Sequence, residues 1–335
     1  MRRREFITVL SGAASMVWPI IARAQQPAKM KRIAMVSSAT KIGDMTITGP
    51  RWFRAFFEEL GALGYAEGRN LLVARYSGEG RLDHYAELAR DIVSTRPDLI
   101  ISMSGPLATA FKTATTTIPI VTIAADPVAA GLVPSLAHSG GNITGVSVDA
   151  GIQIWGKRLG LLIEAIPKLS NTRFLTSQPN WERLEGPAVR EAASQARISL
   201  AAASLGSTFD EAAYQRVFTS MKQDQVDALV VSSEGAHIAN RALLVELAAK
   251  TRIPAIYPLR EFTEVGGLLA YSVDLGDIIR RIADLVDKIL KGANPGDIPF
   301  FQPTKFELII NLKTAKALGL EMPPMLLGRA DEVIE

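Results

Sequence analysis

Most residues able to do chemistry in this 335-residue chain stand directly after short apolar runs that read as β-strands. Their side chains are mainly hydroxyls, an amide and aromatic rings, with few carboxylates. Such a set suits hydrogen bonding of a small polar ligand better than it supplies a general acid and base. The candidate ligand-contacting residues are Ser38, Ser102, Ser104, Gly105, Asp126, Asn180, Ser233, Glu234, Tyr257, Tyr271 and Asp274.

The segment Ser104-Gly105-Pro106 is the most informative of these. Proline is favoured in the first turn of a helix, and glycine before it allows a ligand to approach the backbone closely. The exposed N–H groups of such a helix start hold a carboxylate or a phosphate, and Ser102 and Ser104 add hydroxyl groups. The alternative is that Ser104 only caps the helix.

The other candidates also have structural alternatives. Asp126 either receives a ligand ammonium group or is a turn residue before Pro127. Tyr257 and Tyr271 either stack on a ligand ring or belong to the core, because each follows an apolar run. For an enzyme, Asp126 and Glu234 are the only obvious acid–base pair.

The composition argues against several classes of site. The chain has no cysteine, which removes disulfides, thiolate metal sites and cysteine nucleophiles, and its three scattered histidines leave little room for zinc. We therefore expect no cofactor and no metal. Residues 151–158 have the G-x4-G-K frame of a phosphate loop, but Arg158 stands where Ser or Thr must hold magnesium, so we interpret them as a helix start. The sequence has no stripe of aromatic and basic residues of the kind that would indicate nucleic-acid binding.

The elements that must position these residues follow an α/β pattern that occurs twice. Strands separated by single helices over residues 32–124 predict βαβ units and a parallel sheet. The pattern returns over residues 172–257, and the run that begins at Asp98 has a close echo at Asp227. We predict two Rossmann-like lobes with parallel sheets, joined by a hinge of several crossovers. Ligands bind at the carboxyl ends of such strands, so the candidates should face one cleft.

The last part of the chain does not make a third copy. We expect strands at 267–272, 298–302 and 306–310, a long helix at 275–291 and a short helix at 312–318. The chain should cross back between the lobes there. The predicted first lobe is therefore 31–146 plus about 269–296, and the second is about 147–268 plus 297–325.

The first 24 residues have the layout of a secretory signal peptide. Arg2, Arg3 and Arg4 precede a mostly apolar stretch, and Ala22-Arg23-Ala24 has the form of a cleavage site. The start also resembles the twin-arginine export motif, although the general secretion route stays open. Removing residues 1–24 takes four of the 37 basic and one of the 34 acidic residues, which leaves a formally neutral chain. The pI of about 9.1 is thus due to the basic residues of the signal peptide and does not indicate an acidic binding partner.

Several longer motifs carry a family resemblance over nearly the whole chain. They include Asp126-Pro-Val-Ala-Ala-Gly-Leu-Val, Ser139-Gly-Gly-Asn-Ile-Thr-Gly145, Ile256-Tyr-Pro-Leu-Arg-Glu-Phe262 and the segment from Pro303 to Gly319. The sequence resembles the ABC transporter substrate-binding proteins of the tryptophan/tyrosine type. That resemblance implies the type I periplasmic-binding-protein fold, with two lobes around a hinge.

The residues and the resemblance together predict a periplasmic solute receptor, with the signal removed after Ala24. It would capture a small carboxylate-bearing, amino-acid-like ligand in the cleft and deliver it, as a monomer, to an inner-membrane ABC permease. Closure would be a hinge motion. The alternatives are an extracytoplasmic enzyme on a two-lobed frame and a ligand-binding partner of a signalling receptor.

Overall fold

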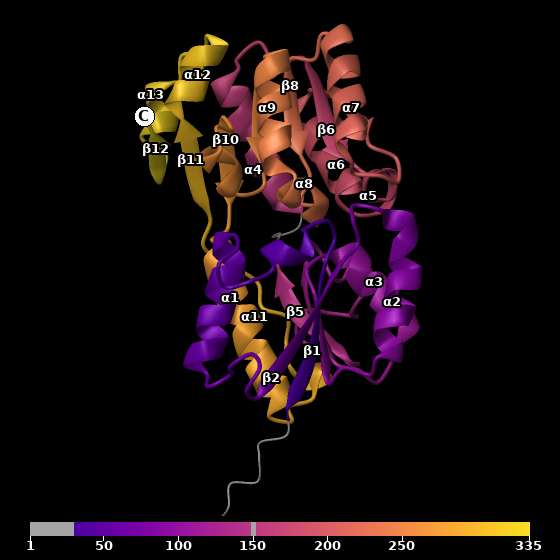
Figure 1. Ribbon diagram of the computed structural model, residues 1–335. Coiled ribbons are helices and arrows are strands. Elements are labelled where there is room, and N and C mark those ends of the chain that lie inside the picture. Colours follow the sequence, from indigo (N-terminus) through magenta and orange to yellow (C-terminus); the bar gives the residue numbers. More distant parts are fainter. Residues whose placement is uncertain (1–29, 149–151) are drawn as a thin grey trace, which may run out of the picture.

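The computed structural model describes residues 30–148 and 152–335, which form two α/β lobes stacked one above the other (Figure 1). The predicted signal peptide lies outside the described residues. Among the helices of those two ranges, none has both the length and the apolar character needed to cross a bilayer. The same ranges hold no group of three or more His, Asp or Glu side chains arranged to bind a metal ion.

The first lobe is built on a fully parallel sheet with the strand order β2-β1-β3-β4-β5. Its strands are β1 (Lys31–Ser37), β2 (Leu71–Ser77), β3 (Leu99–Ser102), β4 (Ile120–Ala124) and β5 (Ile143–Ser147). The helices and turns between them are η1 (Ile42–Asp44), α1 (Arg51–Ala62), η2 (Leu82–His84), α2 (Tyr85–Ser94) and α3 (Gly105–Ala114).

Apolar periodicity explains these elements. All four residues of β3 are buried, as expected for a central parallel strand covered on both faces. In α1, Trp52, Phe53, Phe56 and Leu60 repeat at helical spacing and are all buried. This helix therefore packs its aromatic face inward, and Trp52 reaches the junction of the two lobes.

The second lobe has seven strands in the order β12-β11-β10-β9-β8-β6-β7. They are β6 (Asn171–Thr176), β7 (Ser199–Ser204), β8 (Ala228–Val231), β9 (Ala255–Tyr257), β10 (Leu269–Ser272), β11 (Glu307–Asn311) and β12 (Glu332–Ile334). Only the β10–β11 pair within this described sheet is antiparallel. Its helices are α4 (Ile152–Ala165), α5 (Gln178–Arg183), α6 (Glu185–Ala196), α7 (Glu211–Gln223), α8 (Gly235–Ala239), α9 (Arg241–Thr251), α10 (Glu261–Glu264), α12 (Leu312–Leu318) and α13 (Pro324–Leu327).

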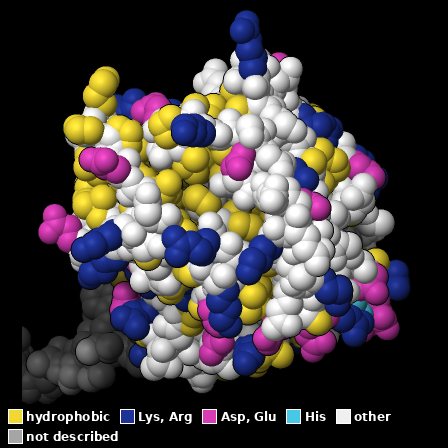
Figure 2. Space-filling view, turned by 90° about the horizontal axis from the view of Figure 1, so that it is seen from above, with side chains coloured by type: hydrophobic (Ala, Val, Ile, Leu, Met, Phe, Trp, Pro, Cys, Tyr) yellow, Lys and Arg dark blue, Asp and Glu magenta, His cyan; other side chains and the backbone are white. Residues whose placement is uncertain are grey.

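The outer end of the second lobe mixes charged and apolar side chains. Seen from above, apolar atoms gather on the left side, where α12 and α13 lie in Figure 1, among Lys, Arg, Asp and Glu side chains (Figure 2). Met325 of α13 is 81% exposed.

The two lobes with mostly parallel sheets confirm the predicted fold class.

The chain passes between the lobes three times. It leaves β5 after Val148 for α4, leaves β10 for α11 (Leu275–Leu290), and returns through η3 (Pro295–Asp297) and Phe301 to β11. Although α11 belongs late in the sequence, it packs beside α1 in the first lobe (Figure 1). These passages are the hinge that the sequence predicts.

Two details of the last segment differ from the expectation. Strand β10 was expected in the first lobe, as part of 269–296, but it pairs with β9 and β11 of the second sheet. The crossing therefore falls after Ser272. Residues 298–302 were expected as a strand, but only Phe301 forms a bridge, with Val146 of β5. This stretch runs along the edge of the first sheet, and its Phe300 side chain is buried in the hydrophobic core of the first lobe.

The similarity between the sequences that begin at Asp98 and Asp227 has a structural reason. Asp98 precedes β3, and its carboxylate accepts the backbone N–H of Arg32 in β1 at 2.7 Å. Asp227 precedes β8 in the same way and accepts the N–H groups of Ser170 and Asn171 at the start of β6, which lowers the pKa of Asp227. In both lobes an aspartate thus joins the first strand of the lobe to a neighbouring strand.

Candidate functional site

A cavity of about 150 Å³ lies between the lobes, at the carboxyl ends of the strands. The first lobe contributes the ends of β1, β3 and β4 together with α1, and the second contributes α5, α6, α8 and the segment after β9. Parallel α/β sheets present their strand ends and helix starts to ligands in this way. The cavity is therefore the candidate ligand site.

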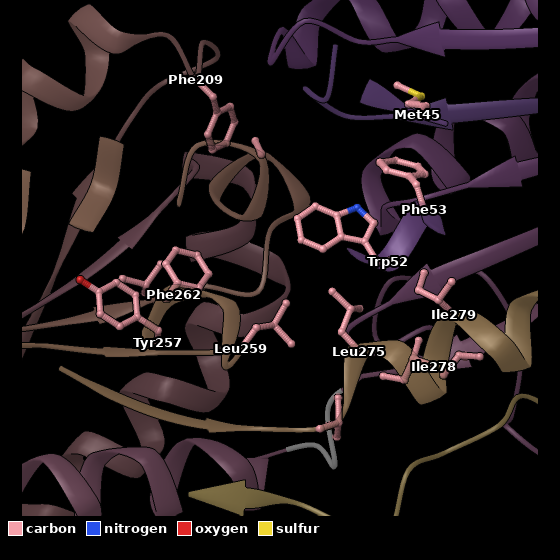
Figure 3. Close-up of a cluster of buried hydrophobic side chains, with 14 of the residues drawn as sticks. Met45, Trp52, Phe53, Phe209, Tyr257, Leu259, Phe262, Leu275, Ile278 and Ile279 are labelled. Atoms are coloured by element: carbon pink, nitrogen blue, oxygen red, sulfur yellow. The ribbon is translucent and has the colours of Figure 1, made fainter. Parts of the chain in front are cut away.

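One side of the cavity is apolar. Figure 3 shows Trp52 at the junction, with Phe53 and Ile279 of the first lobe on one side and Leu259 of the second lobe on the other. Arg241 of the second lobe places its guanidinium 4.8 Å from the centre of the Trp52 ring. The other large apolar side chains that line the cavity are Met103, Ile123, Val148, Trp155, Leu184, Ile238 and Leu275.

The start of α3 enters the cavity from the first lobe. Ser104 and Gly105 both line it. Ser104 is the N-cap residue, and its Oγ accepts the backbone N–H of Leu107 at 3.4 Å. Ser102 Oγ instead donates to the backbone carbonyl of Ser104 at 2.9 Å, which holds this turn in place. The helix start thus presents backbone N–H groups and the positive end of the helix dipole to the cavity.

The second lobe supplies two buried carboxylates with different surroundings. Glu234 accepts the hydroxyls of Ser177 and Ser232 at 2.6 and 2.9 Å, and the backbone N–H of Ser177 at 2.9 Å. Glu185, at the start of α6, accepts the backbone N–H of Ser233 at 3.1 Å. Asn180 contacts both groups, since its Nδ2 lies 3.1 Å from Glu185 and 3.4 Å from Glu234.

Arg158 of α4 is the cationic side chain among the described residues that line the cavity, and it is 2% exposed. Its Nε donates to the backbone carbonyl of Tyr271 at 3.2 Å, and one terminal nitrogen donates to that of Pro258 at 3.4 Å. The guanidinium also stacks on the Trp155 ring at 4.7 Å. Because α4 follows the first crossing and Tyr271 precedes the second, Arg158 joins the cavity to the hinge.

A buried network of aromatic side chains packs next to Glu234. His237 is fully buried, its Nδ1 lies 2.8 Å from the Tyr214 hydroxyl, and its Nε2 lies 3.7 Å from Glu234. Burial lowers the pKa of His237 to about 4, although Glu234 acts in the opposite direction. Burial also raises the pKa of Tyr85 and of Tyr214, and the charge of Glu234 adds to this. This network stays uncharged around the Glu234 carboxylate at neutral pH.

With this cavity described, comparison with known proteins decides the family. The sequence model of the ABC transporter substrate binding proteins matches residues 52–334. The chain belongs to this family.

One protein is similar to this chain in sequence, and two solved structures are similar to it in fold. A tyrosine-binding protein from Clostridioides difficile (strain R20291) is 28% identical over 271 residues, which cover 80% of this chain and 76% of the relative. A conserved domain protein from Vibrio cholerae superposes with a TM-score of 0.78 and 23% identity, over 91% of this chain and all of that one. A Streptococcus pneumoniae ABC domain in complex with L-Trp gives 0.77 and 22%, with the same coverage. The fold is that of the type I periplasmic binding proteins.

The structure brings six of the predicted candidates to the cavity of this family member. They are Ser104, Gly105, Asp126, Asn180, Ser233 and Glu234. Asp126 is exposed at the rim, and its Oδ1 accepts the backbone N–H groups of Val128 and Ala129 at 3.0 and 2.9 Å. Its turn role is therefore present, and one of its oxygens serves it.

The other five candidates lie away from the cavity lining. Tyr257 is buried and stacks on Phe262 with ring centres 4.7 Å apart, while Tyr271 stacks on Phe306 at 5.7 Å. The Tyr257 ring belongs to the core of the second lobe, whereas the Tyr271 ring is half-buried and packs against the edge of that core. The remaining three are Ser38 (buried between the lobes), Ser102 (buried beneath α3) and Asp274 (the N-cap of α11).

Sequence reasoning missed Glu185, the aromatic lining and the role of Arg158. Glu185 does not follow a strand, so the rule based on strand ends could not find it. The usable signal was a carboxylate at a helix start one turn after the Asn180 segment. Arg158 was considered only as a misfit in a phosphate loop, and the structure places it inside α4.

Proposed function

We propose that this chain is the ligand-binding component of an ABC import system, and that it captures an amino acid with a large apolar side chain. The observation that carries the proposal is the composition of the interlobe cavity. It joins an apolar side built around Trp52, Phe53 and Trp155 to the buried charges of Glu185 and Arg158. An amino acid zwitterion with an apolar side chain matches such a surface in charge and polarity.

The proposed ligand is held at both charged groups. Its carboxylate faces the backbone N–H groups at the start of α3, near Ser104 and Gly105, with Arg158 as a further source of positive charge. Its ammonium group faces Glu185, which is 6% exposed. Relatives support this ligand class, since one is named for binding tyrosine and another contains L-Trp.

The proposed cellular location of the protein is the periplasm. The support is the signal-like sequence of residues 1–24, with cleavage after Ala24, and the membership of the ABC transporter family. We further propose that the protein acts as a monomer and that its partner is an inner-membrane ABC permease. In this scheme the ligand bridges the lobes, and the closed form docks on the permease.

A thermal-shift panel tests the ligand. It contains the twenty amino acids, aromatic acids without an amino group, aromatic amines without a carboxylate, and small carboxylates. At about 100 times its dissociation constant, a true ligand adds about 2.7 kcal/mol to the free energy of unfolding. L-tyrosine and L-tryptophan should raise the melting temperature, and the single-charge analogues should do so much less. If no compound in the panel raises it, the proposal fails.

The same samples separate the alternatives. Mass analysis after long incubation shows whether a stabilising compound is converted, which would favour an enzyme. Transport into vesicles that contain a candidate ABC permease and its ATPase, with and without this protein, distinguishes import from signalling. Uptake that is independent of the protein would contradict the import role.

A further inference from the structure

Two turns from different lobes meet through their backbones. In the first lobe, residues 80–82 connect β2 to η2, and in the second lobe residues 207–209 connect β7 to α7. The N–H of Leu82 donates to the carbonyl of Ser207 at 3.1 Å, and the N–H of Phe209 donates to that of Gly80 at 3.0 Å. Arg81 and Thr208 face each other as an antiparallel bridge. We call residues 80–82 and 207–209 the clasp.

The clasp lies on the sheet edges away from the hinge. Strand β2 is at one edge of the first sheet, whereas the crossing to α4 leaves from β5 at the other edge. In the second sheet β7 is an edge strand, and the crossings use β10 and β11 near the opposite edge. The clasp therefore joins the lobes across the side of the cleft that opens when the hinge opens.

Both turns are shaped for this contact. Gly80 has a φ of +71°, and a Cβ atom placed on it would lie 3.1 Å from the Cβ of Phe209, so a side chain there would be strained and crowded. The Gly80 N–H also donates to the carbonyl of Ser38 at 2.8 Å, directly after β1. Phe209 packs edge-on against His237, with ring centres 5.3 Å apart. Each half of the clasp is thus fixed to elements that line or support the cavity.

We propose that the clasp is a backbone latch that holds the cleft closed and sets the rate at which a ligand leaves. Its two interlobe hydrogen bonds use only main-chain groups, so the latch acts in the same way on any ligand that fits the cavity. Each such bond contributes a modest net free energy, which suits a contact that must also open. Opening requires both bonds to break together, because they flank a single bridge.

The absence of cysteine allows a direct test. In an antiparallel bridge of this pattern, the facing Cα atoms are about 4.5 Å apart, which is within the range for a disulfide. The variant Arg81→Cys with Thr208→Cys should therefore oxidise rapidly, whereas Glu79→Cys with Thr208→Cys, which is out of register, should not. Equal oxidation rates for the two pairs would overturn the proposal.

The disulfide also tests ligand release. We expect the oxidised Arg81→Cys/Thr208→Cys variant to release L-tyrosine or L-tryptophan at least tenfold more slowly than the same protein reduced with dithiothreitol, in stopped-flow tryptophan fluorescence. The reduced form is the matched control, since only the bond differs. Equal release rates in the two forms would contradict a latch.

A second variant removes one hydrogen bond without a new covalent link. Leu82 is the first residue of η2 and follows Arg81, which has extended dihedral angles, so Leu82→Pro fits the backbone; it removes the N–H donor together with the packing of the leucine side chain. Leu82→Ala keeps that N–H and loses the same packing, which makes it the matched control. We expect Leu82→Pro to release the ligand about three to ten times faster than Leu82→Ala. Identical rates would speak against the latch.

The latch is tested separately from the proposed ligand. Should neither amino acid bind the unaltered protein, the proposed function fails, but the oxidation rates still report on the clasp. Small-angle scattering without ligand then compares Leu82→Pro with Leu82→Ala. A larger radius of gyration for the proline variant supports the latch, and equal radii together with equal oxidation rates overturn it.

Discussion

Glu185 and Glu234 are two buried carboxylates of one cavity, and their hydrogen bonds divide their roles. The two oxygens of Glu234 accept hydroxyl and backbone donors from the turns after β6 and β8, so this group holds those turns together. Glu185 accepts the N–H of Ser233 and the amide of Asn180. A carboxylate with backbone and amide donors, next to an apolar wall, is suited to receiving an ammonium group.

The first prediction therefore concerns Glu185. Glu185→Gln keeps the shape and can still accept hydrogen bonds from Ser233 and Asn180, but it removes the charge. We expect the dissociation constant for L-tyrosine or L-tryptophan to rise about tenfold or more in isothermal calorimetry. Glu182→Gln is the control, because Glu182 is an exposed carboxylate of the neighbouring helix α5 that does not line the cavity. An equal loss in both variants would contradict the special role of Glu185.

Single residues also show where sequence reasoning ends. The hydroxyl and glycine at Ser104 and Gly105 were predictable, because Gly-Pro marks a helix start and the strand before it fixes their place. Tyr257 and Tyr271 stand near the ends of β9 and β10, yet the buried Tyr257 stacks on Phe262 and the half-buried Tyr271 stacks on Phe306. The direction of a side chain at a strand end depends on neighbours distant in sequence, which local patterns do not contain.

At the scale of elements, α8 of the second lobe meets the strand ends of the first lobe at Gly235. A Cβ atom placed there would lie 2.8 Å from Ser38 Oγ and 3.2 Å from the carbonyl of Met103. Both neighbours belong to the opposite lobe, and the Met103 carbonyl is backbone that does not swing away. Glycine at this position allows the lobes to approach each other fully.

The second prediction follows from this contact. Gly235→Ala should leave each lobe folded but hinder closure, so ligand affinity falls about tenfold while the ligand-free melting temperature changes little. Gly160→Ala in α4 is the matched control, since nothing lies within 4 Å of its added methyl group. That substitution should stabilise the protein by up to about 1 kcal/mol and leave affinity unchanged. Unchanged affinity in Gly235→Ala would show that the lobes close without this contact.

Most elements were predictable because their apolar periods are regular, and the exceptions have local causes. Strand β5 is short and is interrupted by Gly145, and the sequence pattern of residues 32–124 did not extend to it. Yet a Cβ atom on Gly145 would lie 1.9 Å from the carbonyl of Thr122, so the sheet requires glycine there. Residues 298–302 look like a strand, but only Phe301 pairs, because the chain is crossing between lobes. Crossing points depend on the whole arrangement of lobes.

At the scale of the whole molecule, two buried titratable groups make opposite contributions to the pH dependence of the folding stability. Burial lowers the pKa of His237 to about 4 from an ordinary 6.5. Between these values the unfolded chain binds a proton that the folded protein does not, so His237 makes stability fall as the pH drops from 6.5 to 4. Burial raises the pKa of Glu261 to about 7 from 4.5. Here the folded protein keeps a proton that the unfolded chain loses, so Glu261 makes stability fall as the pH rises from 4.5 to 7.

The third prediction is that these two contributions nearly cancel between pH 4.5 and 6.5. Each slope is up to about 1.4 kcal/mol per pH unit, with opposite sign. Urea unfolding of the unaltered protein should therefore give a nearly flat free energy over this range. Glu261→Gln should leave the His237 slope, so that stability rises with pH, and His237→Gln, whose amide can still bond to Tyr214, should leave the opposite slope. If both variants stay as flat as the parent protein, neither group titrates differently on folding, and the prediction is wrong.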